Sequence, residues 1–393
     1  MKLAKRSNIA PSLTLAMNTK AKQMRAKGID VISFAAGEPD FTTPEHVKEA
    51  GKKAIDGNKT YYTPVSGIIE LKEIVAKKLK KENGLDFTTD EITINSGAKH
   101  SVFNALSVLV ENGDEVIVPS PYWVSYTEMV RILGADFRTI ETSEETGFKI
   151  TPKDLENVFS DRTKVVLLNS PNNPTGAVYN KKEIFAIAEY LEDKDIVIVA
   201  DEIYEKIVYD GNVHVSIAGY SDKIKSKTVI VNGVSKAFSM TGWRIGYAAG
   251  PAEIIGAVNK LQGHTCGNPT SISQWASVAA LQQNSSFITG WVSEFKKRKD
   301  YIVKKLNDCK PITCADPEGA FYVFPNVSGL YGSVLKGNTI KDSVDLADYL
   351  LNKGKIAVVP GKAFGADNYI RISFATSMDN IIEGIKRLEG CLP

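Results

Sequence analysis

The sequence predicts an α/β protein that has a large, mainly parallel β-sheet and a smaller α+β part. Short apolar runs without polar alternation recur along the chain, which is typical of strands buried on both faces of a parallel sheet. Segments with helical periodicity separate these runs, as parallel strand connections require. The chain has 393 residues, 43% of them hydrophobic, which is enough for a large core and for two domains.

Five apolar runs predict the strands of the large sheet, and a different pattern follows them. After about residue 285 the chain has a long charged amphipathic segment at 291–306, then further short strands and a final helix. We therefore expect a domain boundary near residue 285. The predicted strands of the sheet are 92–94, 115–118, 165–168, 196–200 and 228–231, and those of the smaller part are 320–324, 356–359 and 369–374.

The composition favours small molecules as partners. Lys and Arg total 48 against 46 for Asp and Glu, so no broad charge attracts nucleic acid or an anionic membrane. Two basic clusters, at 77–81 and 296–299, lie in amphipathic segments, and we interpret them as solvated helix faces. No apolar run is long enough to span a membrane, and polar residues interrupt the N-terminal stretch too early for a signal peptide. We expect a cytoplasmic protein.

The cysteines and histidines form no recognisable disulfide or metal pattern. Four cysteines without a CxxC pair are too few for a disulfide scaffold in a chain of this size, which favours a reducing compartment. The four histidines are scattered and form no HExxH motif. We expect no catalytic metal.

The candidate functional residues follow the strands of the predicted sheet, because ligands of open α/β sheets bind beyond the carboxyl ends of the strands. The first strand leads through the turn 96–99, Ser-Gly-Ala-Lys, into a helix. Free N–H groups at a helix start suit a phosphate, although such turns are also common without a ligand. The third strand ends in the loop 169–176, whose two prolines and adjacent asparagines fit either a polar site or a structural turn.

Two further strand ends carry ionisable side chains. Asp201 comes directly after five apolar residues, and a buried carboxylate is costly unless it meets a positive group, either a cofactor cation or a structural Arg. Lys236 lies just past the strand 228–231 in a stretch of small and apolar residues, with Arg244 further along the same stretch. Burial there would lower the pKa of the lysine amine and make it a nucleophile.

The run from Ser235 to Tyr247 reads Ser-Lys-x-Phe-x-Met-x-Gly-Trp-Arg-x-Gly-Tyr. It resembles the cofactor-lysine signature of the class I and II aminotransferases, the fold-type I pyridoxal-phosphate enzymes. The resemblance implies a large cofactor-binding domain at 46–285 and a small domain built from an N-terminal arm, 1–45, and the segment 286–393. Further motifs of this family follow in its order: Gly37-Glu38-Pro39-Asp40-Phe41, Tyr62-x-Pro64-x-x-Gly67, Ser120-Pro121-x-Trp123, Pro171-Asn172-Asn173-Pro174-Thr175-Gly176, Asp201-x-x-Tyr204 and Arg371-x-Ser373-Phe374-Ala375.

The resemblance implies pyridoxal 5'-phosphate as the cofactor. Lys236 would carry it as a Schiff base and, once released, would move the proton during catalysis. Asp201 would pair with the pyridinium nitrogen, which keeps the ring an electron sink. Asn173 and Tyr204 would hydrogen-bond the phenolic oxygen, and Trp123 would stack on the ring. The phosphate would be held by the side chains of Arg244 and Ser235, the backbone of Gly97, Ala98 and Lys99, and Tyr62 of the partner subunit.

The same resemblance implies a homodimer with active sites at the subunit interface, acting on amino acids and 2-oxo acids. Arg371 would clamp the substrate α-carboxylate in a planar, bidentate way, helped by Asn173, Trp123 and the backbone of Gly37.

Substrate choice depends on the distal pocket. The region 262–269 lacks the Arg that animal aspartate aminotransferases use for the distal carboxylate. Lys99 stands where a Lys takes that role in the bacterial and plant branch of the family. We therefore expect transfer of the amino group of L-aspartate to 2-oxoglutarate by a ping-pong mechanism. Thr14 lies in the arm where a Thr accompanies the use of prephenate, so an aspartate/prephenate aminotransferase is an alternative.

The sequence also fits other activities of this fold. The shared cofactor residues also fit an aromatic, branched-chain or alanine aminotransferase, a β-lyase or a decarboxylating transferase of the same fold. A regulator that only senses pyridoxal phosphate is not expected, because such proteins carry a DNA-binding module before the domain, whereas here the arm starts within about the first dozen residues.

Overall fold

The large sheet of the computed structural model has seven strands, which are β2 (Ile92–Asn95), β3 (Glu115–Ser120), β4 (Asp136–Glu141), β5 (Thr163–Asn169), β6 (Val197–Asp201), β7 (Thr228–Gly233) and β8 (Gly246–Ala249). The structure describes residues 3–7, 9–282 and 286–392. The strand order is β2-β8-β7-β6-β5-β3-β4, and β8 runs in the opposite direction to the other six strands. The prediction of a mainly parallel sheet is confirmed.

Two strands of this sheet were not predicted from the sequence. β4 forms an edge of the sheet. Most of its residues are exposed and half of them are charged, so it lacks a continuous apolar run. β8 is short and consists of Gly, Tyr and two Ala. Gly246 lets the start of the helix α4 (Ala98–Leu109) lie close to β8, since a Cβ at position 246 would lie 2.2 Å from the backbone nitrogen of Ala98.

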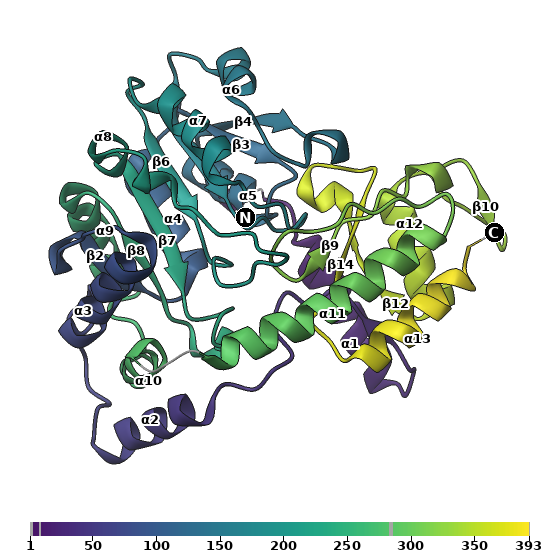
Figure 1. Cartoon of the computed structure of the whole chain (residues 1–393), viewed down its shortest axis with the longest axis horizontal. Helices are drawn as coiled ribbons and strands as arrows, with labels where there is room; N and C mark the ends of the chain where they lie inside the picture. Colours follow the sequence, from purple (N-terminus) through teal and green to yellow (C-terminus); the bar gives the residue numbers. More distant parts are fainter. Residues whose placement is uncertain (1–2, 8, 283–285, 393) are drawn as a thin grey trace.

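Helices cover both faces of the large sheet (Figure 1). Successive residues of a strand point to opposite faces, so Val116 and Val118 pack with α4, α5 and α9, whereas Ile117 packs with α6, α7 and α8. Each such buried aliphatic side chain contributes about 1.5–3 kcal/mol. The bounds are α4 Ala98–Leu109, α5 Ser125–Leu133, α6 Pro152–Val158, α7 Lys181–Leu191, α8 Asp222–Lys225 and α9 Ala252–Thr265.

Three more helices are α2 (Glu45–Asp56), α3 (Ile69–Lys78) and α10 (Ser271–Gln282). α10 packs against both α2 and α3, and α3 also contacts β2. Their apolar residues share a cluster with β2 and β8. Among the described helices, none combines the length and the apolar character that crossing a bilayer requires.

A smaller α+β region combines the two ends of the chain (Figure 1). The long helix α11 (Ser286–Asp308) leads into it, and α1 packs near β12 and β13 although some 300 residues separate them in sequence. β1 pairs in parallel with β12, and β13, β14 and β9 form an antiparallel sheet. The remaining bounds are α1 Leu13–Ala26, β1 Ile32–Ser33, β9 Tyr322–Val323, β10 Val334–Leu335, β11 Asn338–Thr339, α12 Ser343–Tyr349, β12 Ile356–Ala357, β13 Val359–Pro360, β14 Ile370–Ser373 and α13 Met378–Glu389.

This arrangement bears on the predicted domains without deciding their boundaries. Residues of α1 and β1 share one hydrophobic cluster with the segment from α11 to α13, as an arm that belongs to the small domain would. The same cluster also includes Ile203, Tyr204 and Tyr209 from the chain after β6. Residue 285, where we predict the boundary, lies outside the described residues.

The interpretation of the two basic clusters as solvated helix faces is wrong for three of their members. Lys78, Arg298 and Lys299 are 7%, 5% and 1% exposed. A buried cation is costly unless a carboxylate compensates it, and each of the three has such a partner. The partners are Glu205 for Lys78, Asp40 for Arg298, and Asp210 and Asp316 for Lys299.

Candidate active site

A cavity of about 240 Å³ lies beyond the carboxyl ends of β5, β6 and β7. This is the edge at which the sequence places its candidate residues, and most of them line the cavity. The lining residues are Thr14, Gly37, Ala98, Lys99, Trp123, Tyr126, Asn169, Asn173, Asp201, Ile203, Tyr204, Ser235, Lys236, Thr241, Arg244, Tyr322 and Arg371.

Lys236 presents its amine inside this cavity. Its Nζ donates a hydrogen bond to the carbonyl oxygen of Gly37 at 2.6 Å and lies 5.8 Å from the ring centre of Tyr204. Burial lowers the pKa of the Lys236 amine to about 8, and the positive charges of Arg371 and Arg244 act in the same direction. A fraction of this amine is therefore neutral and nucleophilic near pH 7.

Asp201 ends β6 and is 4% exposed. Its carboxylate accepts hydrogen bonds from the Tyr126 hydroxyl at 2.7 Å and from the backbone N–H of Ile203 at 3.2 Å. Burial raises the pKa of Asp201 to about 6, so its ionised form gains from a cation nearby. None of the ion pairs between described residues involves Asp201, so the structural Arg that the sequence left open is not found there.

The start of α4 and Arg244 form an anion-binding end of the cavity. No side chain caps α4, so its first N–H groups are available to a ligand. Arg244 adopts a left-handed backbone, and its guanidinium donates to the carbonyl oxygens of Thr241 at 2.8 Å and Ser96 at 3.2 Å. Gly97, at φ +90°, is needed here because a Cβ would lie 2.3 Å from the Arg244 guanidinium. A phosphate fits this end.

Arg371 supplies a second anion-binding end. It is 2% exposed, and its guanidinium donates to Asn173 Oδ1 at 3.0 Å and to the Ala35 carbonyl oxygen at 2.9 Å, while its Nε has no partner among the described atoms. Its face lies 4.5 Å from the ring centre of Tyr322. Burial lowers the pKa of Arg371, which still remains charged at neutral pH. A buried guanidinium without a carboxylate is costly, and a carboxylate ligand would compensate it.

Lys99, Trp123 and Thr14 line a third part of the cavity wall. The Lys99 ammonium lies 4.8 Å from the ring centre of Trp123. Loss of hydration, and then the charge of Arg244, lowers the pKa of Lys99. The hydroxyl of Thr14, at the start of α1, is buried and has no hydrogen-bond partner among the described residues. Both side chains are free to bind a polar ligand group.

Five lining residues were not among the predicted site residues. Tyr126 and Thr241 lie inside or next to quoted motifs, and Asn169 opens the predicted loop, so a sequence signal existed nearby. Ile203 lies inside the Asp201-x-x-Tyr204 motif, whereas Tyr322 lies in none of the quoted motifs. The Tyr322 hydroxyl lies 2.8 Å from that of Tyr204, a contact between segments far apart in sequence.

Of the predicted residues, Gly97 is not among the lining residues, and Tyr62 does not reach the cavity of its own chain. Its side chain is 98% exposed. The role expected for it concerns the partner subunit, so this position in a single chain does not test that role.

One group of possible metal ligands exists among the described residues, and none of its members lines the cavity. Glu202, Glu205 and His214 bring ligand atoms within 4.8 Å of one another, although the sequence showed the histidines as scattered. The Lys78 ammonium already bonds Glu205, and Ser216 donates to Glu202 at 2.5 Å. The negative charge of this group is thus partly compensated by the protein itself.

The cavity combines an amine of lowered pKa, a buried carboxyl group and two anion-binding ends, which suits an enzyme that handles a phosphorylated carbonyl compound and a carboxylate. Residues 29–388 match the family of class I and II aminotransferases. The chain belongs to this family and is a transaminase, as predicted.

Individual relatives cover the chain almost completely. The chain is 44% identical to an aspartate aminotransferase of Bacillus subtilis over 99% of this chain and 98% of that protein. It is 43% identical to an aspartate/prephenate aminotransferase of Cereibacter sphaeroides over 98% of this chain and 96% of that protein. The crystal structure of the Rhizobium meliloti aspartate aminotransferase matches with a TM-score of 0.96 and 42% identity, covering 100% of this chain and 98% of that one. The predicted fold class is confirmed.

Proposed function

We propose that this transaminase uses pyridoxal 5'-phosphate to move the amino group of L-aspartate to 2-oxoglutarate. The observation that carries the proposal is the chemistry of one cavity. It holds the amine of Lys236, the buried carboxyl group of Asp201, the uncapped start of α4 beside Arg244, and the guanidinium of Arg371 without a carboxylate partner. Each of these groups suits a different part of the cofactor or of an amino-acid substrate.

The residues present fit the cofactor. When bound, pyridoxal phosphate supplies an aldehyde for an amine and a ring that accepts electrons from the substrate. Lys236 would hold the aldehyde end of the cofactor and, once free, would move a proton at the substrate α-carbon. Asp201 holds the ring nitrogen in its protonated form, and this cation lowers the pKa of Asp201 below its value of about 6. Asn173 and Tyr204 bind the phenolic oxygen, and Trp123 covers one face of the ring.

The phosphate contacts follow from the anion-binding end at α4. The phosphate is held by the Arg244 guanidinium and the Ser235 hydroxyl. It is also held by the backbone at the start of α4, at Gly97, Ala98 and Lys99. We include a homodimer in the proposal, in which Tyr62 of the partner subunit completes this end. Its support is the 98% exposure of that side chain, which is unusual for a tyrosine.

The substrate contacts follow from Arg371 and Lys99. Arg371 binds the α-carboxylate together with Asn173, Trp123 and the backbone of Gly37, which orients the α-carbon bond that breaks. Lys99 binds the distal carboxylate, because its ammonium lies at the cavity wall without a carboxylate partner among the described ion pairs.

The free hydroxyl of Thr14 favours a second candidate, an aspartate/prephenate aminotransferase, because it offers a hydrogen bond to a larger polar acceptor. Such activity would add prephenate as an amino acceptor without changing the cofactor residues. We also propose that the protein works in the cytoplasm, since its four cysteines are all free thiols.

The proposed function is tested with the protein loaded with pyridoxal phosphate. L-aspartate should bleach the long-wavelength absorbance of the bound cofactor, and 2-oxoglutarate should restore it.

Lys99→Ala should lower kcat/KM for L-aspartate by about tenfold or more while changing that for L-alanine by less than about twofold, because only the dicarboxylic substrate loses an ion pair.

Lys181→Ala is the matched control, since Lys181 also lies at a helix start with its ammonium over an aromatic ring, 5.3 Å from the centre of Phe185, but outside the cavity. Equal losses for aspartate and alanine in Lys99→Ala would refute the role of Lys99. Irreversible release of ammonia or pyruvate would instead identify a lyase.

A further inference from the structure

Two chain segments that meet at the cavity form a short antiparallel ribbon. Residues 204–210 follow β6, and residues 316–322 lead into β9. Val208 and Gly319 form an antiparallel bridge. The N–H of Ala320 donates to the Ile207 carbonyl oxygen at 2.9 Å, and the N–H of Tyr209 donates to the Glu318 carbonyl oxygen at 2.9 Å. The ribbon joins a segment of the predicted large domain to one of the predicted small domain.

The first end of this ribbon lies in the cavity. There the hydroxyl groups of Tyr204 and Tyr322 are 2.8 Å apart, and both residues are lining residues. If Tyr322 donates to Tyr204, the proton of Tyr204 is left for a ligand. The position of the Tyr204 hydroxyl therefore depends on how the two strands of the ribbon are held together.

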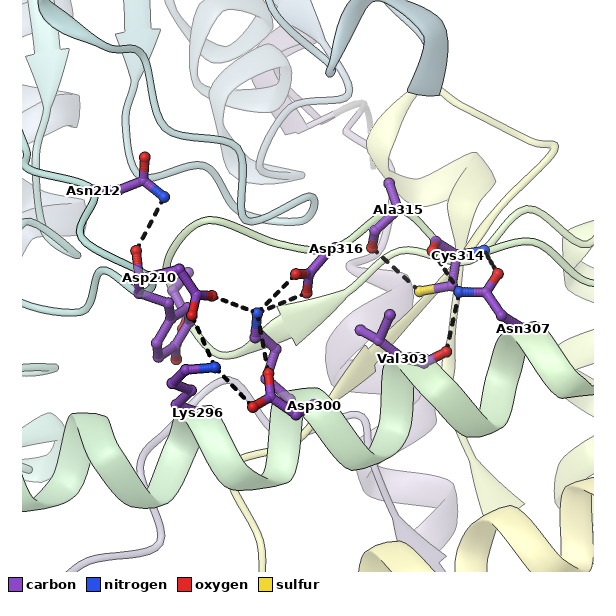
Figure 2. A network of polar contacts seen from close by, with 12 residues as sticks. Asp210, Asn212, Lys296, Asp300, Val303, Asn307, Cys314, Ala315 and Asp316 are labelled. Carbon is purple, nitrogen blue, oxygen red and sulfur yellow. Dashed lines mark hydrogen bonds and ion pairs between the residues drawn. The ribbon is translucent and has the colours of Figure 1, made fainter.

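The second end is closed by Lys299 of α11. Its Nζ lies 2.7 Å from an oxygen of Asp210, 2.8 Å from one of Asp316 and 3.3 Å from one of Asp300. Figure 2 shows the carboxylates of Asp210, Asp300 and Asp316 turned toward one side-chain nitrogen above α11. The lysine side chain is 1% exposed, whereas the carboxylates are 41–60% exposed. A buried ammonium with several carboxylate partners is held in one place, unlike a surface ion pair.

Asp210 and Asp316 lie on opposite strands of the ribbon, so Lys299 joins the two strands at the end that is remote from the tyrosines. We propose that Lys299 is a positioning residue for the transamination reaction: it fixes the ribbon and, through it, the Tyr204–Tyr322 pair. This inference rests on the proposed function for the role of Tyr204 toward the cofactor oxygen. Its structural part, the fixing of the ribbon, does not.

Lys296, one turn earlier on α11, provides a matched control. Its Nζ bonds Asp210 at 2.8 Å and Asp300 at 2.7 Å, but it has no ion pair with Asp316, and its side chain is 41% exposed. Replacing Lys296 thus removes an equal positive charge and its ion pairs with Asp210 and Asp300, which are also partners of Lys299. The two strands of the ribbon stay joined by Lys299.

The first measurement is amide hydrogen exchange of the full chain without cofactor, comparing Lys299→Met with Lys296→Met. In Lys299→Met, the amides of Tyr209 and Ala320 should exchange about tenfold faster or more, since local opening of the ribbon becomes easier. In Lys296→Met, they should change by less than about twofold. Unchanged exchange in Lys299→Met would overturn the proposal. If this variant does not fold, Asp316→Asn, at an exposed position, should show the same direction.

The second measurement is a pH titration of the protein loaded with pyridoxal phosphate. The absorbance of the bound cofactor is followed, and the midpoint is the pH at which half of this cofactor has changed its protonation state. A hydrogen bond donated by Tyr204 stabilises the deprotonated phenolic oxygen and lowers the titration midpoint, so Lys299→Met should raise it by about half a pH unit or more. Lys296→Met should leave the midpoint unchanged, and Lys299→Arg should bring the midpoint most of the way back to the wild-type value. A loosened ribbon with an unmoved midpoint would overturn the positioning role. Failure of the wild type to form the band would refute the proposed function but not the fixing of the ribbon.

Discussion

Lys236→Ala is expected to lower kcat by at least about 10³-fold, because we propose that this one amine both binds the cofactor and moves the proton. The same change should leave the fold intact. Among the residues that the structure describes, the Lys236 amine makes a single hydrogen bond, to Gly37, and its removal frees the cavity of an amine whose burial is costly. Steady-state transamination and the thermal unfolding temperature measure the two parts of this expectation.

The outcome separates chemistry from stability. A variant that keeps its unfolding temperature and loses turnover supports the role of Lys236. Adding a small primary amine such as methylamine should restore part of the activity, because it replaces the missing base. Retention of full activity by the variant would contradict the account.

Arg371→Leu is expected to lower kcat/KM by about 10²- to 10³-fold for amino acids and 2-oxo acids alike, because both substrate types present the same α-carboxylate. Most of the loss should appear in KM. Among the described residues, the guanidinium of Arg371 has hydrogen bonds to two neutral partners, Asn173 and Ala35, so a substrate carboxylate would supply the charged partner that these lack.

Arg298→Leu is the comparison for this prediction. Arg298 is also buried, but it already has a carboxylate partner, Asp40, and it does not line the cavity. Its replacement should lower the unfolding temperature and leave KM within about twofold. Equal changes of KM in both variants would mean that Arg371 acts through stability rather than through the substrate.

The strands that sequence reasoning could predict are those with continuous apolar runs. β5 and β7 are buried on both faces and have only apolar residues at their centres, so burial alone predicts them. The edge strand β4 alternates charged and apolar residues, and β8 has too few large side chains. Their pairing depends on neighbours that only the folded chain provides.

The candidate site was predictable where an ionisable side chain follows a buried strand and a family motif suggests its role. Asp201 and Lys236 each follow a buried strand, and the structure places both in one cavity. Contacts that join distant segments were not predictable. Tyr322 meets Tyr204 only because the chain ends fold back over the sheet.

The basic clusters illustrate the same limit. The sequence pattern at Lys299 is that of an exposed helix face, and only the positions of Asp210 and Asp316 reveal that its ammonium is buried.

Peptide mapping after borohydride reduction would show which lysine carries the cofactor. Borohydride converts the link between pyridoxal phosphate and a lysine into a stable secondary amine, which mass spectrometry locates. We expect the pyridoxyl phosphate group on the peptide that contains Lys236 and not on the peptide that contains Lys99. Modification of Lys99 or of another lysine, with Lys236 unmodified, would contradict it.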